Sequence, residues 1–282
     1  MAVTRVNRRL KLAALAIALV AFVAVALLYW ASLREVRWRA AGRSGQFSQA
    51  AHASLSRGAY LYQTAARCAA CHGSDLGGGP MLQNPLVAAL WVPNLTRGNA
   101  SVSAYTDAEF ERAIRRGLRP DGMRLLLMPS WDYAAMTDDD VASVIAYVRS
   151  AKRVVRDPPE FHQGILGRLM LVTGALGFDS DRIADAVRPD PSRAAGAYAA
   201  RIGGCMRCHA GVGDTPRLSG VPFERTGEPA STLRRLDRAT FAAGLNGAGA
   251  GGRAPSHRFP APRGGFSDAD VTALYRYVQS LP

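Results

Sequence analysis

Two short cysteine–histidine motifs use every cysteine in this 282-residue chain. The motifs are Cys68-Ala-Ala-Cys71-His72 and Cys205-Met-Arg-Cys208-His209. Cys-x-x-Cys-His is the attachment signature of c-type haem, in which the two thiols bond covalently to the haem vinyl groups and the adjoining imidazole is the proximal ligand of the iron. Two copies of the motif therefore predict two covalently bound haem c groups.

Two other chemistries also use paired cysteines. Four thiolates can bind a zinc ion, and each Cys-x-x-Cys pair can form a redox disulfide. Neither chemistry requires a histidine directly after the second cysteine, yet both copies have one. No cysteine remains for a structural disulfide, so we expect the covalent haem chemistry in both motifs.

The chain is strongly basic, with a net charge of +13 that comes almost entirely from arginine. A charge of this sign suits nucleic acid, an anionic membrane surface or an acidic protein. Covalent haem argues against nucleic acid, and no nucleic-acid-binding motif occurs in the sequence. We therefore expect the basic surface to face lipid headgroups or an acidic redox partner.

An uncharged apolar run from Leu12 to Leu33 follows four basic residues near the N-terminus. Its length matches the roughly 20 residues that a helix needs to span a bilayer. Tyr29 and Trp30 lie near its end, where aromatic side chains occupy the membrane interface. A cleaved signal peptide is the alternative, although its apolar region is normally shorter.

The orientation of this expected anchor follows from the haem motifs. Arginines lie on both sides of the apolar run, so the distribution of positive charge does not decide the orientation. Haem c is attached on the outer side of the bacterial inner membrane. We therefore expect a single-pass protein with a cytoplasmic N-terminus and with nearly everything after Leu33 in the periplasm.

The sequence around the two motifs is duplicated. Gly58-Ala59-Tyr60 precedes the first motif as Gly196-Ala197-Tyr198 precedes the second. Downstream, a Thr or Ser followed by carboxylates predicts a capped helix start at residues 137–141 and again at 267–271. Apolar residues then follow at helical spacing. Each repeat thus predicts a helix, a haem motif, an irregular middle section and a terminal amphipathic helix.

This order of elements resembles the class I cytochrome c fold, in which the first and last helices cross and loops surround the haem. The resemblance implies an all-α fold, with an N-terminal transmembrane helix followed by two class I cytochrome c-like domains. The expected divisions are a cytoplasmic N-terminus and anchor at residues 1–33, a juxtamembrane linker at 34–52, cytochrome c domain 1 at 53–152, an interdomain linker at 153–192 and cytochrome c domain 2 at 193–282.

The interdomain linker contains an apolar stretch from Ile165 to Phe178 that is too short to span a bilayer. It either packs against a haem domain or lies at the membrane interface. The sequence leaves both interpretations open.

The resemblance also implies ligands for the first haem. Met128, which precedes Pro129 in a loop ahead of the terminal helix, matches the distal Met-Pro ligand of the family. Met136, next to the cap of the terminal helix, is expected in the core or as a hydrophobic staple of that helix, and the Pro93 carbonyl is expected to hold the Nδ1 proton of His72. A series of arginines at 112, 115, 116, 119 and 124 either docks an acidic partner, pairs with haem propionates or forms a solvated surface.

The second haem departs from this pattern. Phe259-Pro260 occupies the position that matches Met128-Pro129, and no methionine follows His209. Three alternatives stay open for the second iron: His257 is its distal ligand, the iron is five-coordinate beside Phe259, or another group binds it.

The whole layout resembles the membrane-anchored dihaem cytochromes c that serve bacterial periplasmic dehydrogenases. This resemblance implies an electron-transfer protein and not itself an enzyme. The electron donor would be a periplasmic dehydrogenase or quinol-oxidising complex, and the acceptor would be a cytochrome or terminal oxidase. A dihaem peroxidase, or a gas or redox sensor with an open second haem, is the alternative.

Overall fold

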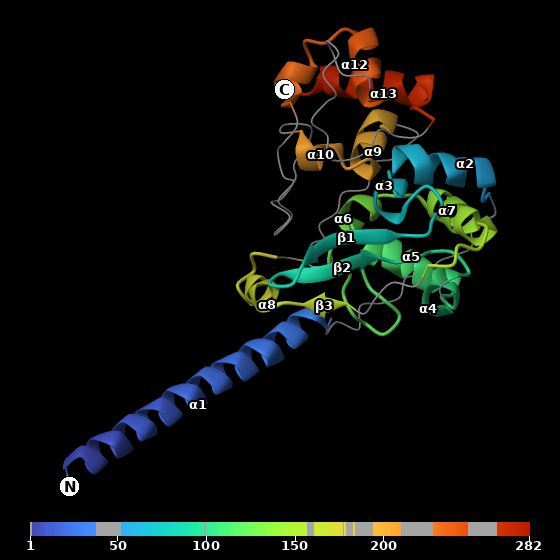
Figure 1. Ribbon diagram of the computed structural model, residues 1–282. Helices are drawn as coiled ribbons and strands as arrows, with labels where there is room; N and C mark the ends of the chain where they lie inside the picture. The colour runs from blue at the N-terminus through green and yellow to red at the C-terminus, as the bar shows by residue number, and fades with distance from the viewer. Residues whose placement is uncertain are drawn as a thin grey trace.

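The computed structural model describes residues 2–37, 52–98, 100–156, 161–176, 178, 183, 194–209, 228–247 and 264–282. The described chain is mostly helical and forms a long N-terminal helix, a first unit at residues 52–156 with the segment that follows it, and a second unit at residues 194–282 (Figure 1). His257 and Phe259 lie outside the described residues.

Helix α1 (Ala2–Val36) projects away from both units (Figure 1). It contains no glycine or proline, so nothing interrupts its backbone hydrogen bonds. Its apolar segment Leu10–Val36 has a mean hydropathy of 2.8 and is almost entirely exposed, with Ser32 as its one buried residue, and it is long enough to cross a membrane. The expected span from Leu12 to Leu33 lies within this segment.

The C-terminal end of α1 is joined to the first unit. The Arg124 backbone N–H donates to the Val36 carbonyl at 2.9 Å, and its guanidinium donates to the Glu35 carbonyl at 3.1 Å. Arg37 also forms a β-bridge with Met123. The helix therefore runs three residues into the expected juxtamembrane linker and ends on the first unit.

The first unit consists mainly of short helices around one core. Its core residues include Leu61, Tyr62, Val141 and Ile145. Helix α2 continues directly into the π-helical turn η1. The elements are α2 (Leu55–Tyr60), η1 (Leu61–Ala65), α3 (Ala69–His72), α4 (Ala100–Ser103), α5 (Asp107–Arg116), α6 (Ser130–Tyr133) and α7 (Asp138–Ser150).

The second unit repeats part of this arrangement around a smaller core that includes Ala200, Phe241 and Leu274. Its elements are α9 (Ala195–Ile202), α10 (Cys205–Cys208), α11 (Ala230–Leu233), α12 (Arg238–Leu245) and α13 (Asp268–Ser280). The predicted caps are confirmed in both repeats, because the Thr137 hydroxyl accepts from the Asp140 N–H and the Ser267 hydroxyl accepts from the Asp270 N–H.

A glycine allows the first and last helices to cross closely in each unit. A Cβ added at Gly58 in α2 would lie 1.9 Å from the Ser143 carbonyl oxygen in α7. At the equivalent place, a Cβ added at Gly196 in α9 would lie 2.1 Å from the Ala273 carbonyl oxygen in α13. Both distances are far below van der Waals contact, so no larger residue fits unless the helices move apart.

The structure departs from the all-α expectation in a small antiparallel sheet with the order β1-β2-β3. Strands β1 (Gly79–Asn84) and β2 (Ala88–Val92) form a hairpin, and β3 (His162–Gln163) pairs with β2. The Asn84 side chain accepts from the N–H groups of Leu86 and Val87 and thereby closes the turn. Strand β3 comes from the expected interdomain linker, which therefore packs on the first unit.

Helix α8 (Ile165–Val172) follows β3 and packs against α1 and against the turn between β1 and β2. The Arg168 guanidinium donates to the Ser32 hydroxyl at 2.8 Å and lies 4.1 Å from the centroid of the Tyr29 ring. The apolar part of the linker thus lies at the end of α1 and against the first unit at the same time.

We predict that Gly58→Ala and Gly196→Ala each reduce the free energy of unfolding by about 1–3 kcal/mol, because the added methyl group overpacks the helix crossing. Gly244 in α12 is the matched control, since nothing lies within 4 Å of a Cβ added there. Gly244→Ala should instead stabilise the protein by about 0.5–1 kcal/mol through helix propensity. Urea denaturation of the three variants measures these effects, and equal effects at all three positions would contradict the close crossing.

Candidate haem centres

The first motif forms a single helical turn. The His72 N–H donates to the Cys68 carbonyl at 2.9 Å, and the turn ends at Gly73, whose φ of +76° is in the left-handed region. Residues three and four positions apart lie on the same face of a helix. The turn therefore presents Cys68, Cys71 and His72 together, which is the arrangement that attachment of one haem requires.

The His72 imidazole is held by a backbone carbonyl, as predicted from the resemblance. Its Nδ1 lies 3.1 Å from the Pro93 oxygen. Burial lowers the pKa of His72, so the ring is neutral and Nδ1 carries the proton that it donates to Pro93. The Nε2 atom is then the free lone pair that can bind iron.

Gly78 keeps the Pro93 carbonyl in this position. The Gly78 N–H donates to the His72 carbonyl at 2.9 Å, and its φ is +65°. A Cβ added at Gly78 would lie 2.1 Å from the Val92 oxygen and 2.8 Å from the Pro93 oxygen. Only glycine fits between the histidine and the segment that orients it.

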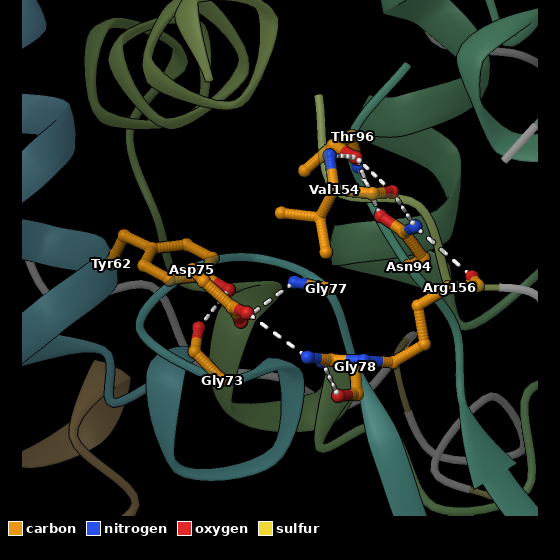
Figure 2. A network of polar contacts seen from close by, with 9 residues as sticks. All are labelled: Tyr62, Gly73, Asp75, Gly77, Gly78, Asn94, Thr96, Val154 and Arg156. Carbon is orange, nitrogen blue, oxygen red and sulfur yellow. Dashed lines mark hydrogen bonds and ion pairs between the residues drawn. The ribbon is translucent and has the colours of Figure 1, made fainter. Parts of the chain in front are cut away.

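A polar network joins the loop after His72 to the segment after α7 (Figure 2). The Asn94 amide donates to the carbonyls of Val154, at 2.8 Å, and of Arg156, at 3.1 Å. The Arg156 guanidinium donates to the Gly78 carbonyl at 2.7 Å and forms an ion pair with Asp75 at 3.2 Å. Residues 153–156, expected in the interdomain linker, thus close the loop around the first motif.

The thiols of the first motif resist ionisation to thiolates. Burial raises the pKa of Cys68 to about 12 and raises that of Cys71 in the same direction. Zinc binding and disulfide exchange both use the thiolate. Burial therefore disfavours the ionised form of these cysteines that both alternatives use.

Met128 lies partly buried against the core of the first unit, where Cys68 and Ala69 also pack. Pro129 begins α6, and the Ser130 N–H donates to the Met128 carbonyl at 2.8 Å. Met136 is buried in the core, as predicted. The role of Met128 as distal ligand stays a prediction.

Buried donors in the first unit suit the carboxylates of haem propionates. The Nε1 of Trp91, two residues before Pro93, and the Nε atoms of Arg112 and Arg119 are buried without a hydrogen-bond acceptor among the described residues. The Nε of Arg115 also has no acceptor among the described residues, although its terminal nitrogen bonds to Asp138 at 2.6 Å and to the Met136 carbonyl at 2.8 Å. A terminal nitrogen of Arg119 likewise pairs with Asp121 at 3.1 Å. The arginine series is therefore not a uniform solvated surface.

The second motif forms the same turn. The His209 backbone N–H donates to the Cys205 carbonyl at 2.9 Å, and the Nδ1 of His209 lies 2.7 Å from the backbone carbonyl oxygen of Glu228. Glu228 thus takes the part that Pro93 has in the first motif, and the sequence analysis missed it. The one available signal was Pro229, a turn residue directly ahead of α11. Because the described residues do not include 248–263, the three alternatives for the second iron stay open.

The two repeats bind each other through a reciprocal pair of contacts. The Tyr198 hydroxyl donates to the Asp140 carboxylate at 2.6 Å and accepts from the Thr137 N–H at 3.2 Å. In the opposite direction, the Tyr60 hydroxyl donates to the Asp270 carboxylate and accepts from the Ser267 N–H at 3.2 Å. The tyrosine of each Gly-Ala-Tyr sequence therefore binds the capped helix start of the other repeat.

Further contacts bring the second motif against the first unit. Arg207, inside the second motif, forms an ion pair with Asp132, which is 1% exposed. The Arg201 guanidinium donates to the Trp131 carbonyl at 2.9 Å and covers its ring. A Cβ added at Gly203 would lie 3.1 Å from the Ala65 oxygen. The approach to Cys205 thus lies beside the approach to Cys68, which sequence reasoning did not show.

Comparison with known proteins agrees with this chemistry. Residues 53–148 match the family described as cytochrome C oxidase, cbb3-type, subunit III. The chain is 38% identical over 112 residues to the fructose dehydrogenase cytochrome subunit of Gluconobacter japonicus, covering 37% of this chain and 23% of that protein. It is 31% identical over 119 residues to the cytochrome c subunit of the alcohol dehydrogenase (quinone) of Gluconacetobacter polyoxogenes. That match covers 40% of this chain and 25% of that protein.

A longer match is to the gluconate 2-dehydrogenase cytochrome c subunit of Pantoea cypripedii, at 26% identity over 281 residues, or 83% of this chain and 60% of that protein. The chain spans about a quarter of the length of the first two relatives. The predicted resemblance to cytochrome subunits of dehydrogenases is confirmed, and the chain carries a cytochrome c domain.

We predict that Gly78→Ala weakens the first haem centre while Gly79→Ala leaves it intact. A methyl group at Gly78 displaces the Pro93 carbonyl and should cost about 1–3 kcal/mol of stability. Nothing lies within 4 Å of a Cβ added at Gly79, so its variant should stay within about 0.5 kcal/mol of the native protein. Thermal unfolding followed by the haem absorption compares the pair, and the same unfolding temperature for both would contradict the assigned role of Gly78.

We predict that Tyr198→Phe loosens the contact between the repeats, at a cost of about 1.5–3 kcal/mol for a bond to a charged group. Burial and the Asp140 carboxylate raise the pKa of the Tyr198 phenol above its ordinary value of about 10. The stabilisation by the neutral phenol is therefore complete below pH about 10 and declines as the pH rises further. Tyr198→Phe should remove part of this alkaline decline.

Tyr275→Phe is the control for this prediction, because the Tyr275 hydroxyl bonds to the Leu236 carbonyl within the second unit. Urea denaturation between neutral pH and pH about 11 measures both variants. An alkaline decline of unchanged size in Tyr198→Phe would show that the phenol does not couple the two repeats.

Proposed function

We propose that this chain, whose residues 53–148 match a cytochrome c domain and which resembles the cytochrome subunits of dehydrogenases, is a membrane-anchored dihaem cytochrome c that relays single electrons in the periplasm. The observation that supports this most is the pair of Cys-x-x-Cys-His turns. In each turn a backbone carbonyl holds the histidine Nδ1, and the two turns approach each other across one interface.

The proposed architecture is a pair of class I cytochrome c-like domains at residues 53–152 and 193–282. Two features of the repeats support it. The first and last helices of each unit cross at an equivalent glycine, Gly58 or Gly196. Each unit also ends in a helix with the same type of N-cap, Thr137 or Ser267.

The protein side chains hold the ligands of each proposed haem centre in place. Haem c, when bound, supplies a one-electron iron couple whose potential depends on the axial ligands, hydrogen bonding and burial. His72 and His209 would bind the iron through Nε2, because Nδ1 of each ring is bonded to a backbone carbonyl. Met128 would favour the reduced state of the first iron. The ion pair of Arg207 with Asp132 holds the second motif against the first unit, so that two bound haems would keep a fixed separation.

The proposed partners follow from the relatives and from charge. The names of the relatives support a periplasmic dehydrogenase as donor, with a quinol-oxidising complex as the other source. A cytochrome or terminal oxidase would be the acceptor. The net charge of +13 would draw an acidic partner to the protein and make that docking sensitive to salt. Helix α1 would hold the protein in the inner membrane, with the N-terminus in the cytoplasm and both haem domains in the periplasm.

A potentiometric titration of the detergent-purified protein tests this proposal. We expect two haems per chain and two one-electron transitions. Met128→Leu should lower the potential of one transition and leave the other unchanged, because a thioether ligand raises the potential. Met136→Leu is the matched control, since a volume-conserving change in the core costs less than about 1.5 kcal/mol and touches no ligand. One haem per chain, or equal shifts in both variants, would contradict the proposal.

Absorption spectra of the reduced native protein with and without carbon monoxide determine the coordination of the second iron. If none of the haem binds the gas, both irons are six-coordinate and His257 becomes the leading ligand, as a simple relay requires. If half of the haem binds the gas, the second iron is open, and the peroxidase or sensor alternative gains support over the relay.

A further inference from the structure

Helix α8 turns an apolar face outward. Four of its side chains are largely exposed, and in a helix they fall within roughly a third of the circumference. They are Ile165 at 51%, Leu166 at 44%, Leu169 at 47% and Val172 at 41% exposure. A helix of a water-soluble domain normally buries such a face, so this one calls for a covering surface.

The orientation of this face is set by the opposite side of α8, where glycines pack on the loop between β1 and β2. A Cβ added at Gly167 would lie 2.1 Å from the Val87 oxygen, and one added at Gly164 would lie 2.2 Å from the Leu86 oxygen. The Leu166 N–H also donates to the Leu86 carbonyl at 2.9 Å. The helix cannot rotate to bury its apolar side, and the exposed Leu86 lies beside it.

The position of α8 along the length of α1 indicates what covers this face. Arg168, which borders this face, bonds to Ser32 and stacks on Tyr29 near the end of the apolar segment of α1. Figure 1 shows α8 beside that end of α1. Tyr29 and the adjacent Trp30 are residues of the kind that mark the border between hydrocarbon and headgroups. If α1 spans a bilayer, α8 therefore lies at that border.

The charge of this region suits an anionic lipid surface. Residues 161–176 contain no carboxylate, and Arg168 is their only arginine or lysine. Arg34 and Arg37 lie at the nearby end of α1, where they outnumber the one carboxylate, Glu35. A short apolar face with basic neighbours is the composition that binds in the interface of a membrane with anionic lipids.

We propose that the α8 stripe, defined as Leu86, Ile165, Leu166, Leu169 and Val172, inserts into the interfacial layer of the membrane that α1 crosses. This inference rests on the membrane anchor of the proposed function. The first unit is then tied to the membrane at two places, through the backbone bond from Arg124 to Val36 at the end of α1 and through the α8 stripe. Two attachments prevent rotation about α1, and the haem-bearing units present a constant face to their partners.

Spin labels on the full-length haem protein in vesicles of phosphatidylethanolamine and phosphatidylglycerol test the proposal. The native cysteines are occupied by haem, so Leu169→Cys, Val155→Cys and Leu19→Cys each provide one labelling site. Val155, exposed on the first unit, is the control for water, and Leu19, exposed in α1, is the control for lipid. Collisions of each label with oxygen, which dissolves in lipid, are compared with collisions with a polar nickel complex.

We expect oxygen collisions to exceed nickel collisions several-fold at Leu169 and Leu19, and the reverse at Val155. A label at Leu169 that behaves like the one at Val155 would place the stripe in water and overturn the proposal. A label at Leu169 that is shielded from both reagents would also overturn it, because a protein surface would then cover the stripe. If the label at Leu19 meets the nickel complex, the anchor itself fails, which separates that failure from failure of the stripe.

Discussion

The reciprocal pairing of Tyr60 with Asp270 and of Tyr198 with Asp140 determines how the two repeats are placed. Each hydroxyl donates to a carboxylate in the first turn of a helix and accepts from an N–H at the same helix start. A helix start carries unpaired N–H groups, and a buried polar group without a partner costs about 1–3 kcal/mol. Each repeat therefore provides a hydrogen-bond partner for an N–H group at a helix start of the other repeat, and these hydrogen bonds break if either repeat shifts.

The contacts between the second motif and the first unit depend on this placement. The ion pair of Arg207 with buried Asp132 and the approach of Gly203 to Ala65 both require the orientation that the tyrosines set. In the proposed relay this geometry matters because the separation of the centres is then a property of the folded chain. A buried ion pair is also costly to leave half made, which makes slippage between the units unfavourable.

The first unit is constrained on its other side by α1. Arg124 joins it to the end of the helix through a backbone bond, and Arg168 joins α8 to Ser32 and Tyr29. Within the first unit, Asn94 and Arg156 close the loop around the first motif. Helix, first unit and second unit thus form a continuous series of packed contacts, and a membrane-bound helix would orient the whole series.

The chemistry of the chain could be predicted from its sequence, because that chemistry is local. Attachment of haem needs residues within one helical turn, a cap needs a side chain three residues ahead of its donor, and a span needs an uninterrupted apolar run. The two motifs, the caps at Thr137 and Ser267, and the apolar run of α1 are all of this kind. The bond from His72 to Pro93 was predicted only through the family resemblance.

Only the tertiary structure decided the contacts between residues far apart in the chain. Glu228, 19 residues further along the chain, holds the His209 ring, and β3 pairs with a hairpin about 70 residues earlier. Tyr198 binds the start of α7 in the first repeat rather than a helix of its own repeat. Nothing in the local pattern distinguishes Tyr198 binding Asp140 from a tyrosine in a core. The outward face of α8 likewise depends on two glycines that pack on a loop from elsewhere in the chain. Such contacts depend on which surfaces remain to be buried once the local elements have formed, and that is a property of the packed whole.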